Sequence, residues 1–470
     1  MCGAIFARVA MGNFVDNYGP RYGISLCIGL TAPAVFCIGL SMNAAGFIVS
    51  RLFIGFSLAT FVACQFWCTS MFTTRIVGSA NAFAAGWGNM GGGFTHFVMP
   101  LIFDGIKHAG VAPFTAWRWA FFVPAGFQMI LAICTVAFAQ DLPDGQYKDL
   151  RAKGALAKPG GWPMWKAALF NYRTWIMTLT YGYCFGVELV SFVFVFRGFG
   201  VARARPPEKN DGKKDDGAPT NQKSPSHNKH PSQTTPQTVD NVITTYLYDQ
   251  FGVSLAVAGM LGSVFGMMNL FTRAFGGIVS DLCARRWGMR GRLWALWSIQ
   301  TAGGILCGAL YFTSHSLGST MAVIVIFSIA CQMSCGLSFG VAPFVSKRAT
   351  GLVSGFTGAG GNVGGAVTQA AFFTAGAMTV PQGFLWMGVL TVGVTALYMG
   401  IYFPMWGGMF CAAKDNVTEE DYYCAEYSAE ERAQGLANPS LKFAHESRSN
   451  RGFKREQEAI AAEKALASGV

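Results

Sequence analysis

The sequence is poor in charge. Only 13% of its 470 residues are Asp, Glu, Lys or Arg, against about 25% in a typical soluble domain. It contains no C-x-x-C pair, no Cys/His cluster of zinc spacing and no Gly-Lys-Ser/Thr after a glycine-rich loop. Nothing in it resembles a catalytic triad. We therefore predict no metal site, no cofactor and no enzymatic activity.

Apolar residues are abundant instead. They make up 52% of the chain, and the mean hydropathy is +0.36. Apolar runs long enough to cross a bilayer recur along the chain, which predicts an all-α polytopic membrane protein. We expect eleven spanning helices, at 2–16, 22–42, 47–72, 77–103, 117–139, 174–189 continuing at 238–250, 254–279, 293–312, 319–341, 350–375 and 383–406.

The net charge of +11 follows the membrane topology. The basic loop residues fall on one side of the expected helices: Arg21, Arg75, the stretch 148–173, the cluster 285–292 and 347–348. The other side has little besides Lys107 and Arg118. Positive residues collect on the cytoplasmic side of a membrane. The basic balance therefore does not indicate nucleic-acid binding, and it places the C-terminal tail in the cytoplasm.

An internal repeat divides the chain. Arg8, Gly12 and Asp16 are spaced four and four, as are Arg273, Gly277 and Asp281. Two glycine-rich stretches inside apolar runs, GWGNMGGG (86–93) and GAGGNVGGA (358–366), follow at a similar offset of roughly 270 residues. A parallel duplication of this kind is one of the standard plans of membrane transporters.

These motifs resemble a known family. GNFVDNYGPR (12–21) and GGIVSDLCARR (276–286) resemble the paired loop motif of the major facilitator superfamily. The two glycine stretches resemble the nitrate motifs of its nitrate/nitrite porter family, and the tail at 415–452 resembles that of plant and algal high-affinity nitrate transporters. The resemblance implies two six-helix bundles around a central site that work by alternating access.

The expected domains follow from this plan. They are an N-terminal bundle (1–140), an inter-bundle loop (141–173), a C-terminal bundle (174–406) and a cytoplasmic tail (407–470). Only seven residues precede Arg8, whereas a whole helix precedes its counterpart Arg273. We therefore expect that the first of twelve helices, roughly 44 residues with its lead, is missing from the sequence as written.

Arg8 and Arg273 are the candidate substrate-binding residues. Each stands two helical turns from its loop aspartate, roughly 12 Å deeper in the membrane, where an arginine is costly and usually functional. The resemblance implies that the pair clamps nitrate. A guanidinium is planar and permanently charged and donates parallel hydrogen bonds, which suits a planar anion. A purely structural role for each arginine is the alternative.

The glycine stretches suggest close helix packing. Gly88 and Gly92 are four apart, as are Gly361 and Gly365, and small residues at that spacing let membrane helices approach closely. Asn89 and Asn362 occupy matching places in the two stretches. We predict that their amides contact the anion or the facing helix.

Three further residues are candidates near the same site. Glu188 is a carboxylate expected in mid-membrane, and it either carries a coupled proton or pairs with one of the two arginines. Tyr181 lines the site or simply packs. His96 aligns with Gln369 of the other half, and plain packing and a pH-sensitive role are both open for it.

The loop motifs are expected to form the cytoplasmic gate. The candidate gating residues are Gly12, Asp16, Arg21, Arg51, Gly277 and Asp281. Arg51, on the third span, is predicted to brace the gate together with Asp16.

Three functions remain open at this point. The first is a proton-coupled nitrate importer of the plasma membrane, with nitrite as an open second substrate and a small single-span accessory protein as an open partner. The second is a nitrate sensor that does not transport, and the third is an inactive product of a defective gene model. No residue pattern supports an enzyme.

Residues 190–237 interrupt an expected helix. YGYCFGVEL (181–189) and TVDNVITTYLYDQFG (238–252) read as one span when joined, and the later part of 190–237 is rich in Pro, Lys, Asp and Ser, a composition that cannot form a core. A polar loop within a spanning helix would leave backbone groups unsatisfied in lipid. Val190-Ser191 and Gln237 can be encoded by a common intron start and end. We predict that 190–237 is a translated retained intron and that the true start lies upstream of Met1.

Sequencing of cDNA across Leu189 and Thr238 tests the intron hypothesis. We expect the mature message to join these two codons directly. A dominant message that retains the codons of 190–237 would contradict it.

Overall fold

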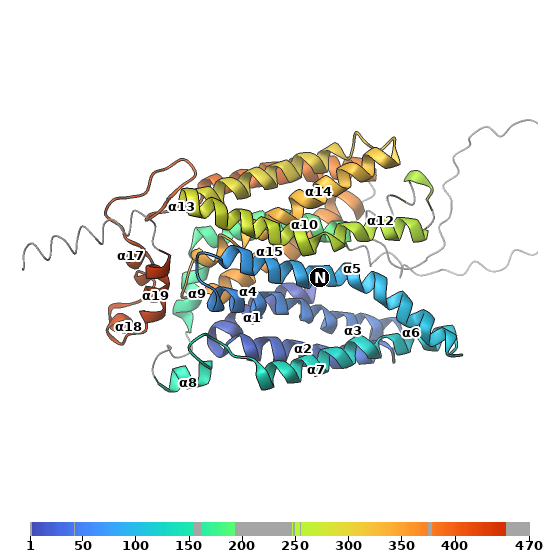
Figure 1. Ribbon diagram of the computed structural model, residues 1–470, viewed down its shortest axis with the longest axis horizontal. Helices are drawn as coiled ribbons and strands as arrows, with labels where there is room; N and C mark the ends of the chain where they lie inside the picture. Colours follow the sequence, from blue (N-terminus) through green and yellow to red (C-terminus); the bar gives the residue numbers. More distant parts are fainter. Residues whose placement is uncertain are drawn as a thin grey trace, which may run out of the picture.

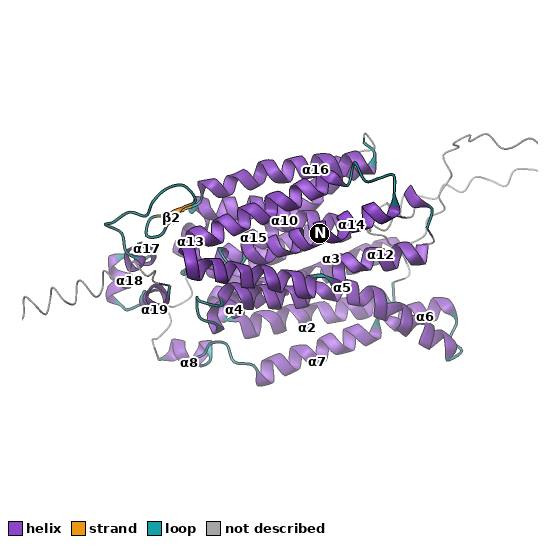
Figure 2. Ribbon diagram, turned by 45° about the horizontal axis from the view of Figure 1, so that its top comes forward, coloured by secondary structure: helices purple, strands orange, loops and turns teal. Residues whose placement is uncertain are grey.

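The protein is described by a computed structural model that covers residues 2–41, 43–153, 161–192, 247, 250–253, 255–374 and 378–447. The described chain is helical almost throughout, as expected. Its exception is a two-residue hairpin, β1 (Tyr402–Phe403) paired antiparallel with β2 (Gly407–Gly408). Figure 2 shows β2 beside the short helices at one end of the molecule, which we call the tail end.

The helices before residue 140 form an N-terminal group. They are α1 (Cys2–Tyr18), α2 (Pro20–Ile38), α3 (Ala44–Gly55), α4 (Thr60–Met71), α5 (Val77–His108), α6 (Pro113–Ala120) and α7 (Phe122–Phe138), with a 3₁₀ turn, η1 (Phe56–Ala59), between α3 and α4. Their starts follow local chemistry. Pro20 and Pro113 open α2 and α6, where no N–H is needed. The Asn43 side chain caps α3 by accepting from the Gly46 amide at 2.8 Å.

The helices after residue 171 form a C-terminal group. They are α10 (Tyr172–Phe192), α12 (Leu255–Met267), α13 (Asn269–Ala309), α14 (Leu317–Ser338), α15 (Thr350–Thr368) and α16 (Val380–Thr395). Short turns of other helix types flank them: η2 (Ala342–Phe344), η3 (Gln369–Thr374) and η4 (Ala396–Gly400). Two short helices on the connection between the groups, α8 (Tyr147–Ala152) and α9 (Trp162–Leu169), lie toward the tail end. The long α13 is two helices joined at Gly288, whose φ of 62° breaks the helix.

Two helix pairs join the groups. Figure 1 shows the N-terminal group below and most of the C-terminal group above, with α5 and α15 between them. Across this boundary α1 packs on α15 and α5 packs on α13. These are the helices that carry the repeated Arg-Gly-Asp spacing and the two glycine stretches, so the duplicated motifs meet at the boundary between the groups.

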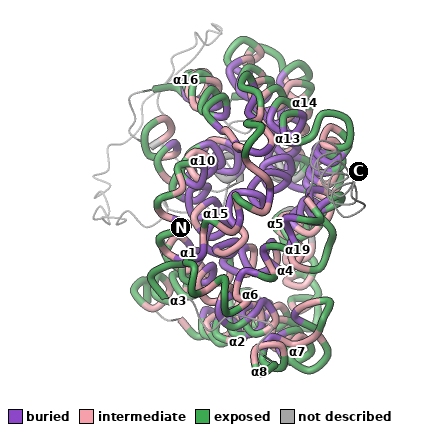
Figure 3. Tube along the Cα trace, turned by 90° about the vertical axis from the view of Figure 1, so that its left-hand side faces the viewer, coloured by how far each residue is buried: buried purple, intermediate pink, exposed green. Residues whose placement is uncertain are grey.

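The outer helices match the requirements of a bilayer. Five described segments are long and apolar enough to cross a membrane, at Pro20–Ile38, Ala44–Met71, Pro113–Phe138, Leu317–Phe344 and Val380–Gly400. On α7 the side chains of Phe127, Ile130 and Ile133 are 60–62% exposed, as expected of a surface that faces lipid. Figure 3, seen from the tail end, shows buried chain at the centre and exposed chain around the rim. The protein is therefore an integral membrane protein, and the count of eleven spans stays a prediction.

Residues 401–447 fold against the tail end, where a polar tail was expected. They form α17 (Glu419–Cys424), α18 (Ala429–Ala433) and α19 (Asn438–Glu446). Arg348 holds α18 through Glu431, with Nη2 2.6 Å from Oε1, and these bonds lower the pKa of Glu431 to about 2. The Tyr423 hydroxyl donates to the Phe344 carbonyl at 3.1 Å. Phe443 of α19 packs on Phe344 with ring centroids 5.7 Å apart.

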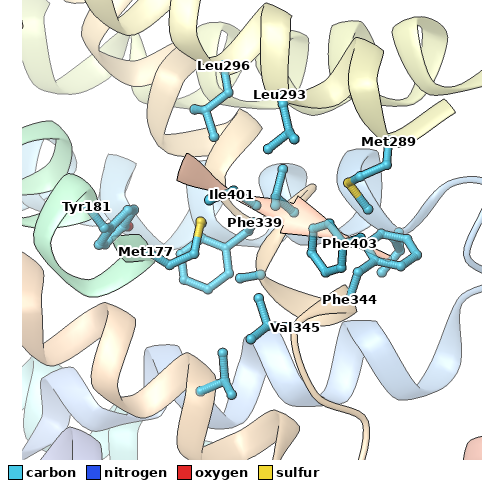
Figure 4. Close-up of a cluster of buried hydrophobic side chains, with 14 of the residues drawn as sticks. Met177, Tyr181, Met289, Leu293, Leu296, Phe339, Phe344, Val345, Ile401 and Phe403 are labelled. Atoms are coloured by element: carbon cyan, nitrogen blue, oxygen red, sulfur yellow. The ribbon is translucent and has the colours of Figure 1, made fainter. Parts of the chain in front are cut away.

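This docking extends a hydrophobic cluster of the C-terminal group. Figure 4 shows the cluster running from Tyr181 and Met177 to Phe344 and Phe403. The Lys347 ammonium lies over the Phe443 ring at 4.8 Å, and its burial there lowers its pKa to about 8. The tail is therefore part of the folded protein up to residue 447.

Glycines let α10 and α15 pack backbone against backbone. A Cβ on Gly364 would collide with the backbone of Gly182, and one on Gly360 with the Thr178 carbonyl. A Cβ on Gly186 would stand 2.6 Å from the Gly365 amide nitrogen. Contact this close requires that at least one of the two facing residues has no side chain.

The predicted packing glycines divide into two sets. Gly361 lies against Phe185, because a Cβ there would be 2.6 Å from its Cδ1, and Gly365 lies beside the α10 backbone. The expectation for Gly88 is wrong, since a Cβ on Gly88 would meet no atom within 4 Å among the described residues. Gly92 is exposed. In this stretch Gly86 makes the close contact, because a Cβ on Gly86 would be 2.6 Å from the Asn269 carbonyl oxygen.

Alanine substitution separates the two kinds of glycine. Gly364→Ala forces α10 away from α15, and overpacking of this sort costs about 1–3 kcal/mol, so we expect the purified protein to melt several degrees lower. Gly88→Ala adds a methyl group in open space and removes a helix-weakening glycine; its melting temperature should stay level or rise. Equal melting temperatures for the two variants would show that α10 and α15 are not in close contact.

Candidate functional site

The two arginines that the sequence suggests as substrate-binding residues both lie against Phe185 of α10. The Cζ atom of Arg8 lies 5.2 Å from the Phe185 ring centroid, and that of Arg273 lies 5.6 Å from it. Each arginine is 1% exposed. One comes from α1 and the other from α13, so the site lies at the boundary between the helix groups. Cation–π contacts of this kind stabilise a buried guanidinium without neutralising it.

Arg8 is held by neutral groups. Its Nη1 donates to the Gly358 carbonyl at 2.5 Å and its Nε to the Leu58 carbonyl at 3.2 Å, and a second ring, Phe61, lies 5.1 Å from its Cζ. Within the described ranges no carboxylate pairs with it. Arg8 therefore presents a buried positive charge that no carboxylate compensates, and a bound anion would stabilise it.

Only part of the Arg273 guanidinium is hydrogen-bonded among the described residues. Its Nη2 donates to Glu188 Oε2 at 2.8 Å, whereas Nε and Nη1 are buried with no partner among the residues described. Two guanidiniums against one carboxylate leave the site with one net positive charge. Arg273 therefore keeps free hydrogen-bond donors although it is paired with Glu188.

Glu188 is the centre of a polar network. Its Oε1 accepts from the Asn269 amide at 2.8 Å and from the Asn89 amide at 3.5 Å, and the Cys335 thiol lies 3.4 Å from Oε2. Of the two roles left open by the sequence, the structure shows the ion pair with Arg273. A proton-carrying role stays a prediction. Asn89 belongs to the N-terminal group, so it reaches across the boundary to Glu188.

Several buried polar atoms near the arginines have nothing to bond to. They are the Tyr181 hydroxyl, the Thr357 hydroxyl and both polar atoms of the Asn362 amide, judged against the described part of the chain. The Tyr181 ring stacks on Phe185 with centroids 5.4 Å apart and planes at 12°. Asn362 follows Gly358, the acceptor of Arg8, by one helical turn and so shares its face. Each unsatisfied buried group costs about 1–3 kcal/mol, a cost that a small anion would relieve.

Thr357 was not among the residues that sequence reasoning selected. It stands four residues before Gly361, which packs on Phe185, and so it projects from the same face of α15. Its position just before the second glycine stretch was the available signal.

The tail end of the boundary is closed by two matching caps. Asp16 of α1 accepts from the amides of Gly351 and Leu352 at 2.8 and 2.9 Å, in the first turn of α15. Asp281 of α13 accepts from the amides of Gly78 and Ser79 at 3.2 and 2.6 Å, in the first turn of α5. A carboxylate at a helix N-terminus binds free N–H groups and complements the helix dipole. Each cap joins one helix group to the other.

Glycines make these caps geometrically possible. A Cβ on Gly12 would collide with the Gly351 carbonyl, and one on Gly277 with the Gly78 carbonyl. The repeated Gly-Asp pairs thus work together: the glycine admits the facing helix and the aspartate binds its end.

Arg292 completes the second cap. The sequence did not predict this role for it. Its Nη2 lies 2.8 Å from Asp281 Oδ1, and its Nη1 donates to the Ser280 hydroxyl at 2.9 Å. It reaches Asp281 because the turn at Gly288 brings the second half of α13 back along the first. The sequence showed it only as one of a basic cluster.

Two predicted gate residues lie elsewhere. Arg21 bonds to the chain that follows α7, with its backbone amide donating to Asp141 at 3.1 Å. Arg51 is exposed, with its Cζ 5.3 Å from the Phe47 ring centroid. No bond joins Arg51 to Asp16 in the described chain, so the expected brace is not formed in this structure. Four-residue spacing identified the right aspartates but could not place an arginine from another helix.

Other expectations fall outside what the structure describes. The side chain of His96 is not described, so packing and pH sensing stay open for it. The predicted insert at 190–237 coincides with described chain only as far as Phe192, the last residue of α10; residues 193–237 lie outside the described ranges.

Comparison with known proteins adds independent findings. The profile of the Major Facilitator Superfamily matches residues 1–204. "Nitrate transporter 2.2" of Chlamydomonas reinhardtii is 50% identical over 461 residues, covering 97% of this chain and 80% of the relative. "High affinity nitrate transporter 2.5" of Arabidopsis thaliana is 44% identical over 451 residues, covering 96% and 80%. Among solved structures, the Escherichia coli fucose:proton symporter FucP has a TM-score of 0.54 at 12% identity, covering 83% of this chain and 85% of that one, a likeness of fold alone.

Proposed function

From the premise that the chain belongs to the major facilitator superfamily and, within it, to the nitrate transporters of algae and plants, we propose that it imports nitrate together with protons by alternating access. The protein is a transporter and not an enzyme. The observation that carries the mechanism is the convergence of Arg8 and Arg273 on Phe185, with unpaired donors around them.

The chemistry of the site suits nitrate. The ion is planar and carries one negative charge spread over three oxygens, and the site holds one net positive charge. Two unpaired nitrogens of Arg273 (Nε and Nη1), the Tyr181 hydroxyl and the Asn362 amide supply hydrogen-bond donors. Planar guanidiniums recognise planar oxyanions in this way. Because Arg8 and Arg273 belong to different helix groups, an anion between them couples the movements of both.

The caps supply the gate. Opening the tail end requires Asp16 to leave α15 and Asp281 to leave α5, and water can then replace the lost bonds at the exposed helix ends. Exposed arginines gather at the tail end, and basic residues favour the cytoplasmic side. We therefore place the tail end and the C-terminus in the cytoplasm and the protein in the plasma membrane. The structure then represents a state closed toward the cytoplasm.

Glu188 supports coupling to protons. Moving one anion into a cell costs about 2.3 kcal/mol per 100 mV of membrane potential, and co-transport of a proton cancels that cost. Protonation of Glu188 would remove the charge that now holds Arg273 and would free this guanidinium for nitrate. Proton and anion would thus bind as a pair. Nitrite as a second substrate and a single-span accessory protein remain predictions from the resemblance.

Conservative substitution of the two arginines tests the clamp. Arg8→Lys and Arg273→Lys keep the charge but lose the planar fork, so we expect labelled-nitrate uptake to fall at least tenfold, about 1.4 kcal/mol, at unchanged abundance in the membrane. Arg51→Lys is the matched control, because Arg51 is exposed, and it should import normally. Wild-type uptake by both test variants would refute the clamp. Nitrate binding without flux in the unmodified protein would indicate a sensor instead.

Glu188→Gln separates coupling from architecture. The amide still accepts hydrogen bonds but cannot release a proton, so we expect proton-driven accumulation of nitrate to be lost while nitrate-for-nitrate exchange persists. Both activities are measured in the same vesicles. If exchange is lost to the same extent as accumulation, Glu188 serves only to hold Arg273.

A further inference from the structure

A cavity that is open to solvent lies at the tail end, and its lining includes neither Phe185 nor the two arginines beside that ring. Its volume is about 1040 Å³. Arg75, between α4 and α5, lines one side, and the turn of α13 around Gly288 lines another. Ala412 and Glu446 of the tail complete it. The N-terminal group, the C-terminal group and the tail thus all contribute to one cavity.

The lining is strongly basic. Arg75, Arg285 and Arg286 are exposed, and none pairs with a carboxylate among the described residues. Arg290 donates to two backbone carbonyls, through Nε to that of Gly408 at 3.0 Å and through Nη2 to that of Cys411 at 3.1 Å. Their charges are therefore available to a ligand.

The acidic residues of the lining do not cancel this charge. Asp281 is neutralised by Arg292, 2.8 Å away, and both its oxygens bind the first turn of α5. Glu446 is the remaining carboxylate. Four arginines against Glu446 leave an excess of three positive charges. A single-charged anion is held weakly in such an open setting because salt screens it, so the cavity suits an anion with several charges.

An aromatic residue places the cavity at the membrane boundary. The Trp287 side chain is 60% exposed beside it, and the Arg286 Cζ lies 5.3 Å from the Trp287 ring centroid. Tryptophan favours the headgroup level of a bilayer, and basic pockets at that level on the cytoplasmic side bind phosphorylated headgroups.

We propose that this cavity binds a polyanion with two or more phosphate monoesters, supplied either by the headgroup of a phosphorylated inositol lipid or by a soluble inositol phosphate. A lipid ligand is expected only if the tail end faces the cytoplasm, as proposed above. The binding site for a polyanion does not depend on that orientation. Arg75 and Arg285 belong to different helix groups, and the caps of α5 and α15 hold these groups together at this end. The ligand therefore binds the closed tail end best and favours that state over the open one.

Binding to the purified full chain in phosphatidylcholine nanodiscs tests the proposal. The probes are a short-chain phosphatidylinositol bisphosphate, inositol hexakisphosphate and inorganic phosphate. The test variant is Arg285→Gln combined with Arg286→Gln. Lys153→Gln combined with Lys166→Gln is the matched control, because both lysines are exposed and lie outside the cavity. The melting temperature of each variant without ligand shows that it is folded.

We expect one or both polyphosphate probes to bind and to raise the melting temperature of the unmodified protein. Each basic residue near such a ligand contributes about fivefold in affinity, so the test variant should bind at least tenfold more weakly while the control is unchanged. Arg75→Gln should also weaken binding, because it removes the contribution of the other helix group. Binding by the lipid alone identifies the membrane as the source, and equal binding by inositol hexakisphosphate identifies a soluble ligand.

Two results would overturn the proposal. One is equal loss of affinity in the test and control variants, which would mean attraction by overall charge. The other is the absence of binding by both polyphosphate probes. Neither bears on nitrate transport, which is assayed separately, so the two proposals can fail independently.

Discussion

The arrangement of the two helix groups depends on a carboxylate from each group that binds the start of a helix in the other. Asp16 holds α15 and Asp281 holds α5. An aspartate at a helix N-terminus gains from both the free amides and the dipole. The α1–α15 contact maintained by the first cap also allows Arg8 to reach the Gly358 carbonyl. Closure at one end and assembly of the candidate site thus depend on the same contact between α1 and α15.

The candidate site combines tight packing with incomplete charge neutralisation. Glycines bring α10 against α15, and the Phe185 ring of α10 lies beside Arg8. The apolar rings and carbonyls around Arg8 make its charge tolerable without cancelling it. Glu188 cancels only the charge of Arg273. In the proposed mechanism an anion completes the site, which has one positive charge in excess, and protonation of Glu188 changes that balance.

Sequence reasoning located the paired residues better than their partners. The equal spacing of Arg8 and Asp16 with Arg273 and Asp281 identified equivalent positions because the two halves are duplicated. Spacing within a helix fixes which face a residue shares, but not which neighbouring helix that face meets. This is why Gly88 was chosen although Gly86 makes the contact. For the same reason, spacing within a helix could not predict the positions of Arg51, Arg292 and Thr357 relative to the neighbouring helices. The folded tail was missed because its few apolar anchors, such as Phe443, are spaced too irregularly to form a periodic pattern.

The docked tail also touches the N-terminal group. The Thr74 hydroxyl donates to the Glu446 carbonyl at 2.7 Å, and Lys442 lies 3.3 Å from Asp144. Because α19 is tethered to the same chain, it meets these partners at an effective concentration of order millimolar, so contacts too weak to join separate molecules are sufficient to keep it in place. A free competitor of the same intrinsic affinity must exceed that effective concentration before it displaces α19.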